Sequence, residues 1–210
     1  MPVLPQKFTH QDVVIEQTES LYQGFFKMVR YQVKHRLYEG GWSDSVQREI
    51  FERGHAVAVL PYDPNTGEFV LIEQFRVGAI ETSSTPWLIE VIAGVIDEGE
   101  TEEGVCIREA EEEAGLHITN LHKACSYLAS PGGTTERIHI FMAKVNAAQA
   151  SGVHGLDSES EDILVHRVSE QQAKVWLEEG IIDNAAAIIA LQWFFMNKNI
   201  LLTKWNGSEK

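Results

Sequence analysis

Apolar and polar residues alternate with a period of two along much of this chain, a pattern that predicts β-strands. Turn signals such as Gly40-Gly41 separate the first runs, which predict a small antiparallel sheet. The β-branched run His55–Leu60 predicts a central strand, and Glu68–Phe75 returns beside it after the turn Asp63–Gly67. The other predicted strands are Val13–Ile15, Phe25–Leu37, Val46–Phe51, Trp87–Ala93, Ile118–Leu128, Arg137–Val145 and Ile163–Val168.

Three helices are predicted between and after these strands. Thr101 can cap a helix that runs to about Ala114, where Gly115 stops it. Ser169 opens a second helix that ends near Gly180, and Asp183 or Asn184 caps a final apolar helix. Strands between helices predict an α/β/α sandwich with a mixed sheet, preceded by the small N-terminal antiparallel sheet. We expect residues 1–54 to form a β region and residues 55–210 the main domain.

The most informative segment is a dense group of carboxylates between Gly94 and Leu116. From Asp97 to Glu113 there are nine acidic residues and no lysine. At about 100° per residue, Glu109 and Glu113 lie one helical turn apart, with Glu112 beside them. Like charges at this spacing destabilise a bare helix, whereas Mg²⁺ or Mn²⁺ requires such hard oxygen ligands. The segment therefore predicts a metal site.

Two neighbours of these carboxylates complete the predicted metal site. Arg108 stands one turn before Glu112 and can hold it by a charge-assisted pair, and the backbone carbonyl of Ala93 is a candidate ligand. The alternative interpretation is an ordinary solvated helix face. It is disfavoured because a solvated helix needs no glycines at fixed distances, such as Gly94 and Gly115, and normally intersperses lysines.

Composition narrows the class of partner. The 210 residues are 44% hydrophobic, as in a globular protein, and carry a formal charge of −14. This charge argues against binding to nucleic-acid backbones, because no basic stripe replaces their counterions. The most apolar segment, Ala185–Met196, is expected to be too short to span a bilayer. We expect a cytoplasmic protein without a membrane or nucleic-acid partner.

The spacing G-x5-E-x7-R-E-A-x-E-E-x-G-L, from Gly94 to Leu116, resembles the signature of the Nudix hydrolases. Along nearly its full length the chain also resembles the bacterial ADP-ribose pyrophosphatases of that superfamily, in which a proline follows the signature at the distance of Pro131. The matching segments are Gly24–Phe26, Arg48–Ala56, Glu73–Arg76, Pro86–Glu90 and Ser130–Arg137. The resemblance implies a Nudix fold and hydrolysis of ADP-ribose to AMP and ribose 5-phosphate. It also implies two or three Mg²⁺ ions (Mn²⁺ possible) and a homodimer that exchanges its N-terminal region.

The same resemblance assigns residues that contact the substrate. Phe25 stacks on the adenine opposite Arg48, and Glu49 accepts the adenine amino group. Independently of the resemblance, Arg53 and Arg76 are candidates to clamp the diphosphate, because they are positive groups at strand ends near the signature in an acidic chain. The remaining implied substrate-binding residues, around the adenine, the diphosphate and the terminal ribose, are Phe26, Val95, Ser130, Pro131, Gly132 and Glu136. As plain structure, the aromatic pair can be core, the arginines surface ion pairs, and the Ser130–Glu136 segment a hairpin loop.

In this family the general base comes from an acidic loop after the signature, which corresponds here to Gly155–Asp162. The resemblance implies Glu159 as the base and Glu161 as a metal ligand beside Glu109, Glu113 and the Ala93 carbonyl. Glu112 is assigned as a further ligand and Arg108 as the residue that orients it.

Two alternatives stay open at this point. The chain can act on another substrate of the same superfamily, such as ADP-mannose, ADP-glucose, NADH or a dinucleoside polyphosphate. It can also be a non-catalytic ADP-ribose sensor, although such sensors commonly lose signature carboxylates that this chain retains.

Overall fold

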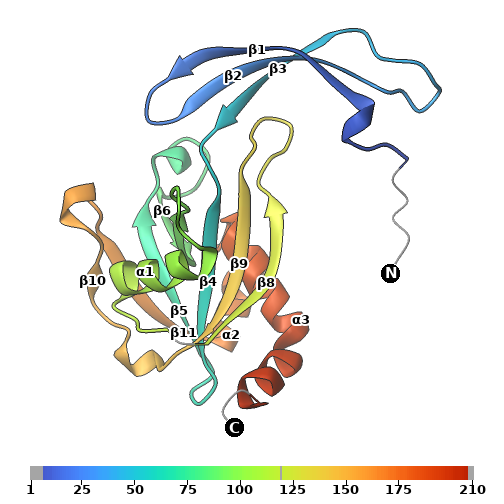
Figure 1. Ribbon diagram of the computed structural model, residues 1–210. Helices are drawn as coiled ribbons and strands as arrows, with labels where there is room; N and C mark the ends of the chain where they lie inside the picture. Colours follow the sequence, from blue (N-terminus) through green and yellow to red (C-terminus); the bar gives the residue numbers. More distant parts are fainter. Residues whose placement is uncertain (1–6, 119, 208–210) are drawn as a thin grey trace. The chain divides into compact units, whose positions relative to one another are not determined.

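The structure is a computed structural model that describes residues 7–118 and 120–207 (Figure 1). Its contacts divide the chain into two compact units. The first unit comprises the chain up to Gly54 together with Leu128–Glu136, and the second comprises His55–Tyr127 with Arg137–Lys210. The segment Leu128–Glu136 therefore packs with the N-terminal strands rather than with the domain that surrounds it in sequence.

The first unit is built on an antiparallel three-stranded sheet in the order β1-β2-β3. Its strands are β1 (Val13–Gln23), β2 (Lys27–His35) and β3 (Val46–Glu52). Directly opposed charges cross the sheet, because Arg30 faces Glu19 on one side and Glu49 on the other and pairs with both, at 3.2 and 3.0 Å. Val29 is the only buried residue among the described residues of these strands. The sheet thus leaves most of its apolar side chains accessible.

Strand β1 is longer than its sequence predicts. The apolar run Val13–Ile15 predicts three residues, whereas the strand continues to Gln23. The added residues are mostly polar, and their cross-strand ion pairs with β2 take the place of an apolar pattern, as in Lys34 with Glu16 at 2.6 Å. At the other end of the hairpin, Phe25 and Phe26 form the turn instead of beginning β2.

The second unit is a mixed sheet with the order β10-β11-β5-β4-β9-β8. Strands β4 and β9 run parallel, whereas β10 with β11, β11 with β5, β5 with β4 and β6, and β4 with β7 run antiparallel. Its strands are β4 (Ala56–Asp63), β5 (Glu68–Phe75), β6 (Trp87–Glu90), β7 (Ile92–Val95), β8 (Asn120–Leu128), β9 (Arg137–Lys144), β10 (Val153–His154) and β11 (Ile163–Ser169).

The segment Trp87–Ala93, predicted as one strand, forms two. Strand β6 pairs with β5, and after Val91 the chain changes partner so that β7 pairs with β4. In the second pairing, Ala93 lies opposite Ala58 and Gly94 opposite Val57. The change of partner brings the end of β7 from the middle of the sheet directly into the loop before the acidic helix.

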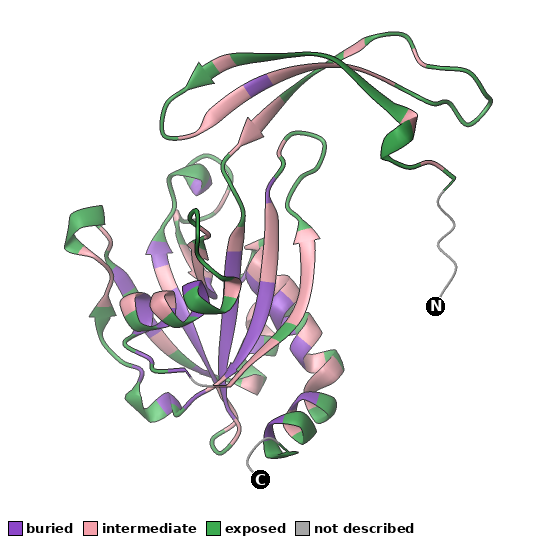
Figure 2. Ribbon diagram, in the orientation of Figure 1, coloured by how far each residue is buried: buried purple, intermediate pink, exposed green. Residues whose placement is uncertain are grey.

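Helices cover both faces of this sheet, so the predicted α/β/α sandwich with a small antiparallel sheet before it is confirmed. The helices are α1 (Glu102–Ala114), α2 (Glu170–Glu178) and α3 (Ala185–Gly207), with short 3-10 turns at His10–Asp12, Val77–Ala79, Ala147–Gln149 and Asp157–Glu159. Val57 and Val59 of β4 face the core under α1, whereas Ala58 and Leu60 face the core under α2 and α3. Burial on both faces explains the continuous apolar run of β4 (Figure 2).

The caps of the helices agree with the sequence. The Thr101 side chain accepts the backbone N–H of Gly104, and Gly115 ends α1 at φ 61°, in the left-handed region. The Ser169 side chain caps α2, and Asn184 rather than Asp183 caps α3. These local signals fix where each helix begins, independently of the core it covers.

Helix α3 corrects the expectation that the final apolar segment is too short to cross a membrane. By length and composition alone it is long and apolar enough, although only 28% of its most apolar window is buried. The core helix of a soluble protein meets the same criterion. One side of α3 packs on the sheet, where the Phe194 ring lies 4.5 Å from Tyr62 and 4.8 Å from Phe69.

Candidate functional site

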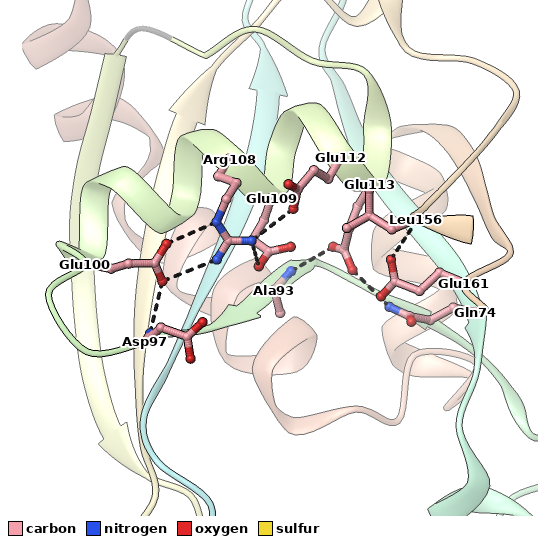
Figure 3. Close-up of polar contacts among 10 residues, drawn as sticks. All are labelled: Gln74, Ala93, Asp97, Glu100, Arg108, Glu109, Glu112, Glu113, Leu156 and Glu161. Carbon is pink, nitrogen blue, oxygen red and sulfur yellow. Dashed lines mark hydrogen bonds and ion pairs between the residues drawn. The ribbon is translucent and has the colours of Figure 1, made fainter. Parts of the chain in front are cut away.

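The carboxylates of α1 crowd against strand β7, as the helical spacing predicts (Figure 3). Glu113 is 3% exposed and accepts the backbone N–H of Ala93 at 3.0 Å. Gln74 Nε2, from β5, lies 3.5 Å from the other Glu113 oxygen, at the limit of hydrogen bonding. The helix thus turns one carboxylate inward, onto the middle of the sheet.

Glycine at position 94 is required by the close approach of Glu109. A Cβ at position 94 would lie 1.9 Å from Glu109 Oε1, so the Glu109 side chain would have to move. Any side chain there would push Glu109 away from β7. The first glycine of the signature therefore serves to let this carboxylate lie against the strand.

Desolvation raises the pKa values of Glu109 and Glu113. Burial raises the pKa of Glu109 to about 7, although Arg108 opposes the shift, and Glu112 and Glu161 add to it by repulsion. Burial also raises the pKa of Glu113 to about 8, with repulsion from Glu109 and Glu161 adding to it. The Ala93 N–H and Arg76 lower it in part. These carboxylates are short of positive charge in this structure.

Arg108 is the cation that lies within the acidic group. Its Nη1 donates to Glu109 at 2.7 Å and to Glu112 at 2.9 Å, and its Nε donates to Glu100 at 3.2 Å. Glu100 also accepts the backbone N–H of Asp97 at 3.0 Å, so it fastens the loop before α1. Arg108 therefore holds Glu112, as predicted from their spacing, and it also holds Glu109 and the loop.

The acidic loop after β10 is attached to the end of α1. The backbone N–H of Gly155 donates to the Glu112 carbonyl at 3.1 Å. Gly155 has φ 106°, and a Cβ there would lie 2.6 Å from Glu161 Cβ. Glu161 in turn accepts the backbone N–H of Leu156 at 3.1 Å and acts electrostatically on Glu109 and Glu113. Glu109 and Glu113 of α1 and Glu161 of this loop thus lie near enough to repel one another.

Glu159 lies in the 3-10 turn Asp157–Glu159 of this loop and is exposed to solvent. The following residue, Ser160, has φ 57° and is the one non-glycine at positive φ among the residues that the structure describes. A left-handed conformation costs an L-residue about 1–2 kcal/mol. On the two sides of this residue, Glu159 is exposed, whereas Glu161 is partly buried.

The donor set fits a hard divalent cation by its chemistry. Buried carboxylates with raised pKa values gain most from a cation of high charge, and oxygen ligands suit Mg²⁺ or Mn²⁺. Each carboxylate is nevertheless engaged by a protein donor: Arg108, the Ala93 N–H or the Leu156 N–H. Within the described ranges, no three His, Cys, Asp or Glu side chains converge closely enough to hold an ion. Binding would therefore require side-chain rotations.

The comparison with known families decides the class. Residues 52–191 match the family model described as NUDIX domain. The chain belongs to the Nudix family. The signature helix α1 and strands β4 to β11 all fall inside the matched range.

Two related proteins match nearly the whole length of this Nudix protein, and a third matches a smaller share. The ADP-ribose pyrophosphatase of Escherichia coli (strain K12) is 54% identical over 202 residues, which cover 96% of this chain and 97% of that protein. The ADP-ribose pyrophosphatase of Haemophilus influenzae (strain ATCC 51907 / DSM 11121 / KW20 / Rd) is 47% identical over 206 residues, 97% of this chain and 95% of that protein. The GDP-mannose pyrophosphatase of Cronobacter sakazakii (strain ATCC BAA-894) is 38% identical over 149 residues, 70% of this chain and 76% of that protein. A solved structure described as an ADP compounds hydrolase has a TM-score of 0.67 at 18% identity, covers 97% of this chain and 98% of that chain, and supports the fold.

The predicted adenine-binding residues of this Nudix protein lie in the first unit. Phe25 is 95% exposed at the β1–β2 turn, with its ring 4.7 Å from that of Phe26. Arg48 donates to the Gln47 carbonyl at 2.7 Å, and Glu49 pairs with Arg30. A core residue would be enclosed by other side chains, whereas the Phe25 ring is almost fully exposed on the turn. Within the first unit, Phe25 is therefore not a core residue.

The predicted ribose-binding loop belongs to the same unit. Its Gly133 carbonyl accepts the Phe51 N–H at 2.8 Å, which attaches the loop to β3. Arg53 pairs with Glu136 at 3.1 Å, and its guanidinium lies 5.3 Å from the centre of the Phe26 ring. Glu136 is buried, whereas the loop residues Ser130, Pro131 and Gly132 are exposed. Arg53 thus forms the ion pair expected of plain structure.

Arg76 and Val95 lie in the second unit with the acidic group. Arg76 pairs with the buried carboxylate of Glu90, and Val95, at the end of β7, is 39% exposed. Sequence reasoning gave no role to Glu90, to Gln74 or to Glu100. All three lie in segments that match the family, but the resemblance does not reveal which residues they contact.

The raised pKa of Glu113 makes the stability of the metal-free protein depend on pH. Its pKa is about 8 when folded and near 4.5 otherwise, so the folded state binds more protons between these values. The free energy of unfolding should therefore fall as pH rises from about 4.5 to about 8, by a few kcal/mol at most. Glu113→Gln should flatten this dependence and should raise Tm above wild type at pH 8.5.

Thermal unfolding in EDTA, followed by circular dichroism across this pH range, measures the effect. Glu111→Gln is the matched control, because Glu111 lies on α1 and is exposed. This control should follow the wild-type profile. Parallel profiles for wild type and Glu113→Gln would contradict the account of burial.

Proposed function

We propose that this Nudix protein is a metal-dependent ADP-ribose pyrophosphatase that hydrolyses ADP-ribose to AMP and ribose 5-phosphate. The observation that carries the proposal is the desolvated carboxylate group on α1, with Glu161 beside it, in a chain related along nearly its whole length to proteins named ADP-ribose pyrophosphatase. The proteins named GDP-mannose pyrophosphatase are less identical and match a smaller share of the chain.

In the proposed site, two or three Mg²⁺ ions, with Mn²⁺ as a substitute, would be held by Glu109, Glu112, Glu113, Glu161 and the Ala93 carbonyl. Bound divalent ions supply charge neutralisation at the diphosphate and a more acidic water. Arg108 keeps Glu109 and Glu112 oriented through its hydrogen bonds to both. The carboxylates and this guanidinium thus form a charged floor for the diphosphate.

Glu159 is proposed as the general base. Its exposure leaves it open to water, and its place on a turn next to Glu161 lets it move toward the diphosphate when the loop closes. It takes the proton of the water that attacks phosphorus, and the phosphoanhydride bond breaks to give AMP and ribose 5-phosphate. A buried carboxylate such as Glu113 is less suited to this task because its oxygens are already enclosed.

Most of the proposed substrate-binding residues lie in the first unit, and Arg76 and Val95 lie in the second. Phe25 and Arg48 sandwich the adenine, and Glu49 accepts its amino group. Arg53 and Arg76 bind the diphosphate. Phe26 supports the aromatic turn, and the remaining contacts, mainly to the terminal ribose, are proposed for Val95, Ser130, Pro131, Gly132 and Glu136.

We also propose that the enzyme is a cytoplasmic homodimer with a small-molecule substrate and no nucleic-acid or membrane partner. The formal charge of −14 disfavours nucleic acid. The first unit has apolar side chains that it cannot bury itself, since Ile15 is 59% and Tyr22 65% exposed. A second copy of the chain would cover such surface. This arrangement would deliver Phe25 to the active site of the other subunit.

Replacing the base tests the proposed chemistry. Glu159→Gln should lower kcat for ADP-ribose about 10²–10⁴-fold with Mg²⁺ present, because the amide cannot accept the proton. Asp157→Asn is the matched control on the same 3-10 turn and should retain wild-type kcat. AMP release is measured, and the same assay on ADP-mannose, ADP-glucose, NADH, GDP-mannose and dinucleoside polyphosphates ranks the alternative substrates.

Two outcomes of this assay would count against the proposal. A kcat for Glu159→Gln within about tenfold of wild type would remove the base assignment alone. Tight nucleotide binding by the wild type without turnover, with any divalent ion, would favour the non-catalytic sensor instead.

Mixing two impaired variants tests the exchange between subunits. Phe25→Ala should be weak at low ADP-ribose concentration, and Glu159→Gln should be nearly inactive. If Phe25 serves the other subunit, a heterodimer contains one intact site, and an equimolar mixture after subunit exchange should recover about a quarter of wild-type activity. Activity no greater than the sum of the separate variants, or full activity in a monomer, would refute the exchange.

A further inference from the structure

Glu90 is a buried carboxylate to which the mechanism above gives no task. It ends strand β6, is 3% exposed, and lies opposite Ile72 of the central strand β5. A buried charge without partners is strongly destabilising, so its hydrogen bonds show what the position is built to hold. Both carboxylate oxygens have protein donors.

One oxygen of Glu90 takes two donors from the same arginine. Arg76 Nε donates to Glu90 Oε2 at 3.0 Å, and Arg76 Nη2 donates to the same oxygen at 2.8 Å. The guanidinium plane is therefore fixed along one edge. Three of its five N–H groups remain outside these two bonds, two on Nη1 and one on Nη2.

The other oxygen of Glu90 is held by the first turn of a helix. Asn184 Nδ2 donates to Glu90 Oε1 at 2.8 Å. The opposite end of the same amide, Oδ1, accepts the N–H groups of Ala186 and Ala187 at 3.0 and 3.2 Å and caps α3. Because both ends of the amide are used, Asn184 cannot rotate without losing the cap, and Glu90 is fixed to α3.

Arg76 itself lies beside the acidic group. Its side chain is 44% exposed, against 4% for that of Glu90. Burial lowers the pKa of Arg76, but Glu90, Glu113 and Glu161 together outweigh it and raise the pKa. The last two carboxylates compete for this guanidinium, and an arginine that turned toward them would be neutralised and withdrawn from a substrate.

We propose that Glu90 is a positioning residue: held by Asn184, it fixes one edge of the Arg76 guanidinium and keeps the remaining N–H groups available to the substrate diphosphate. The inference rests on the proposed function, because it needs Arg76 to bind the diphosphate. Glu90 acts through Arg76 and does not touch the substrate. Its loss should therefore affect substrate binding more than turnover.

Glu90→Gln tests this assignment, because the amide keeps the shape of the side chain and removes its charge. KM for ADP-ribose should rise about tenfold, while kcat stays within about threefold of wild type. In an Arg76→Ala background, Glu90→Gln should add less than about twofold to KM, since the two residues act as one unit. Additive effects on KM, or an unchanged KM in the single variant, would overturn the proposal.

Glu68→Gln is the matched control, because Glu68 stands on the neighbouring strand β5 and also pairs with an arginine, Arg167, at 2.7 Å. It should leave KM unchanged. If Glu90→Gln does not fold, Asn184→Ser replaces it, since serine retains a capping oxygen but cannot donate to Glu90 as the amide does. This variant should raise KM about threefold, and an unchanged KM would overturn the proposal.

The experiment separates the two claims. If the wild type hydrolyses ADP-ribose and the Glu90 and Asn184 variants have an unchanged KM, the positioning role is overturned and the proposed function stands. Absence of turnover in the wild type overturns the proposed function, and the role of Glu90 falls with it.

Discussion

The burial of like charges on one face of α1 is the constraint on which the other features of the site depend. Glu109 and Glu113 lie one turn apart, and desolvation raises the pKa of each toward or above neutrality. Such an arrangement lowers the stability of the folded chain without a cation, because the unfolded chain would ionise both groups freely. A bound divalent cation would remove this penalty by neutralising both carboxylates. The same desolvation thus destabilises the metal-free chain and favours cation binding.

Neighbouring features follow from keeping these carboxylates in place. Gly94 has no side chain because Glu109 occupies the space where one would stand. Gly155 has none because the acidic loop bends closely over Glu161, and its N–H joins that loop to the last turn of α1. Arg108 balances part of the charge by direct hydrogen bonds, whereas Arg76, bonded to Glu90, acts on Glu113 only through space. The distribution of these two arginines leaves Glu113 without an ion pair to a basic side chain among the described contacts.

Local signals made much of this predictable from sequence. The bounds of α1 follow from Thr101 and Gly115, and the two-faced burial of β4 follows from its unbroken apolar run. Long-range partners were not predictable from pattern. Strand β1 continues through polar residues because β2 supplies opposite charges. The chain changes partner at Val91 because β4 and β5 pair with each other only near Tyr62 and Phe69, and β6 and β7 pair with the residues beyond. The contact between Glu90 and Asn184 joins residues 94 positions apart, and no spacing rule reaches that far.

Direct titration with Mg²⁺ is the most direct test of the central claim that the buried face of α1 is a cation site. Isothermal calorimetry on the wild type should detect binding at neutral pH, and Glu109→Gln should weaken the affinity at least about tenfold, because a neutral amide replaces a desolvated anion. Glu111→Gln, on the exposed side of the same helix, should bind as the wild type does. Equal affinity in the wild type and in Glu109→Gln would contradict the account.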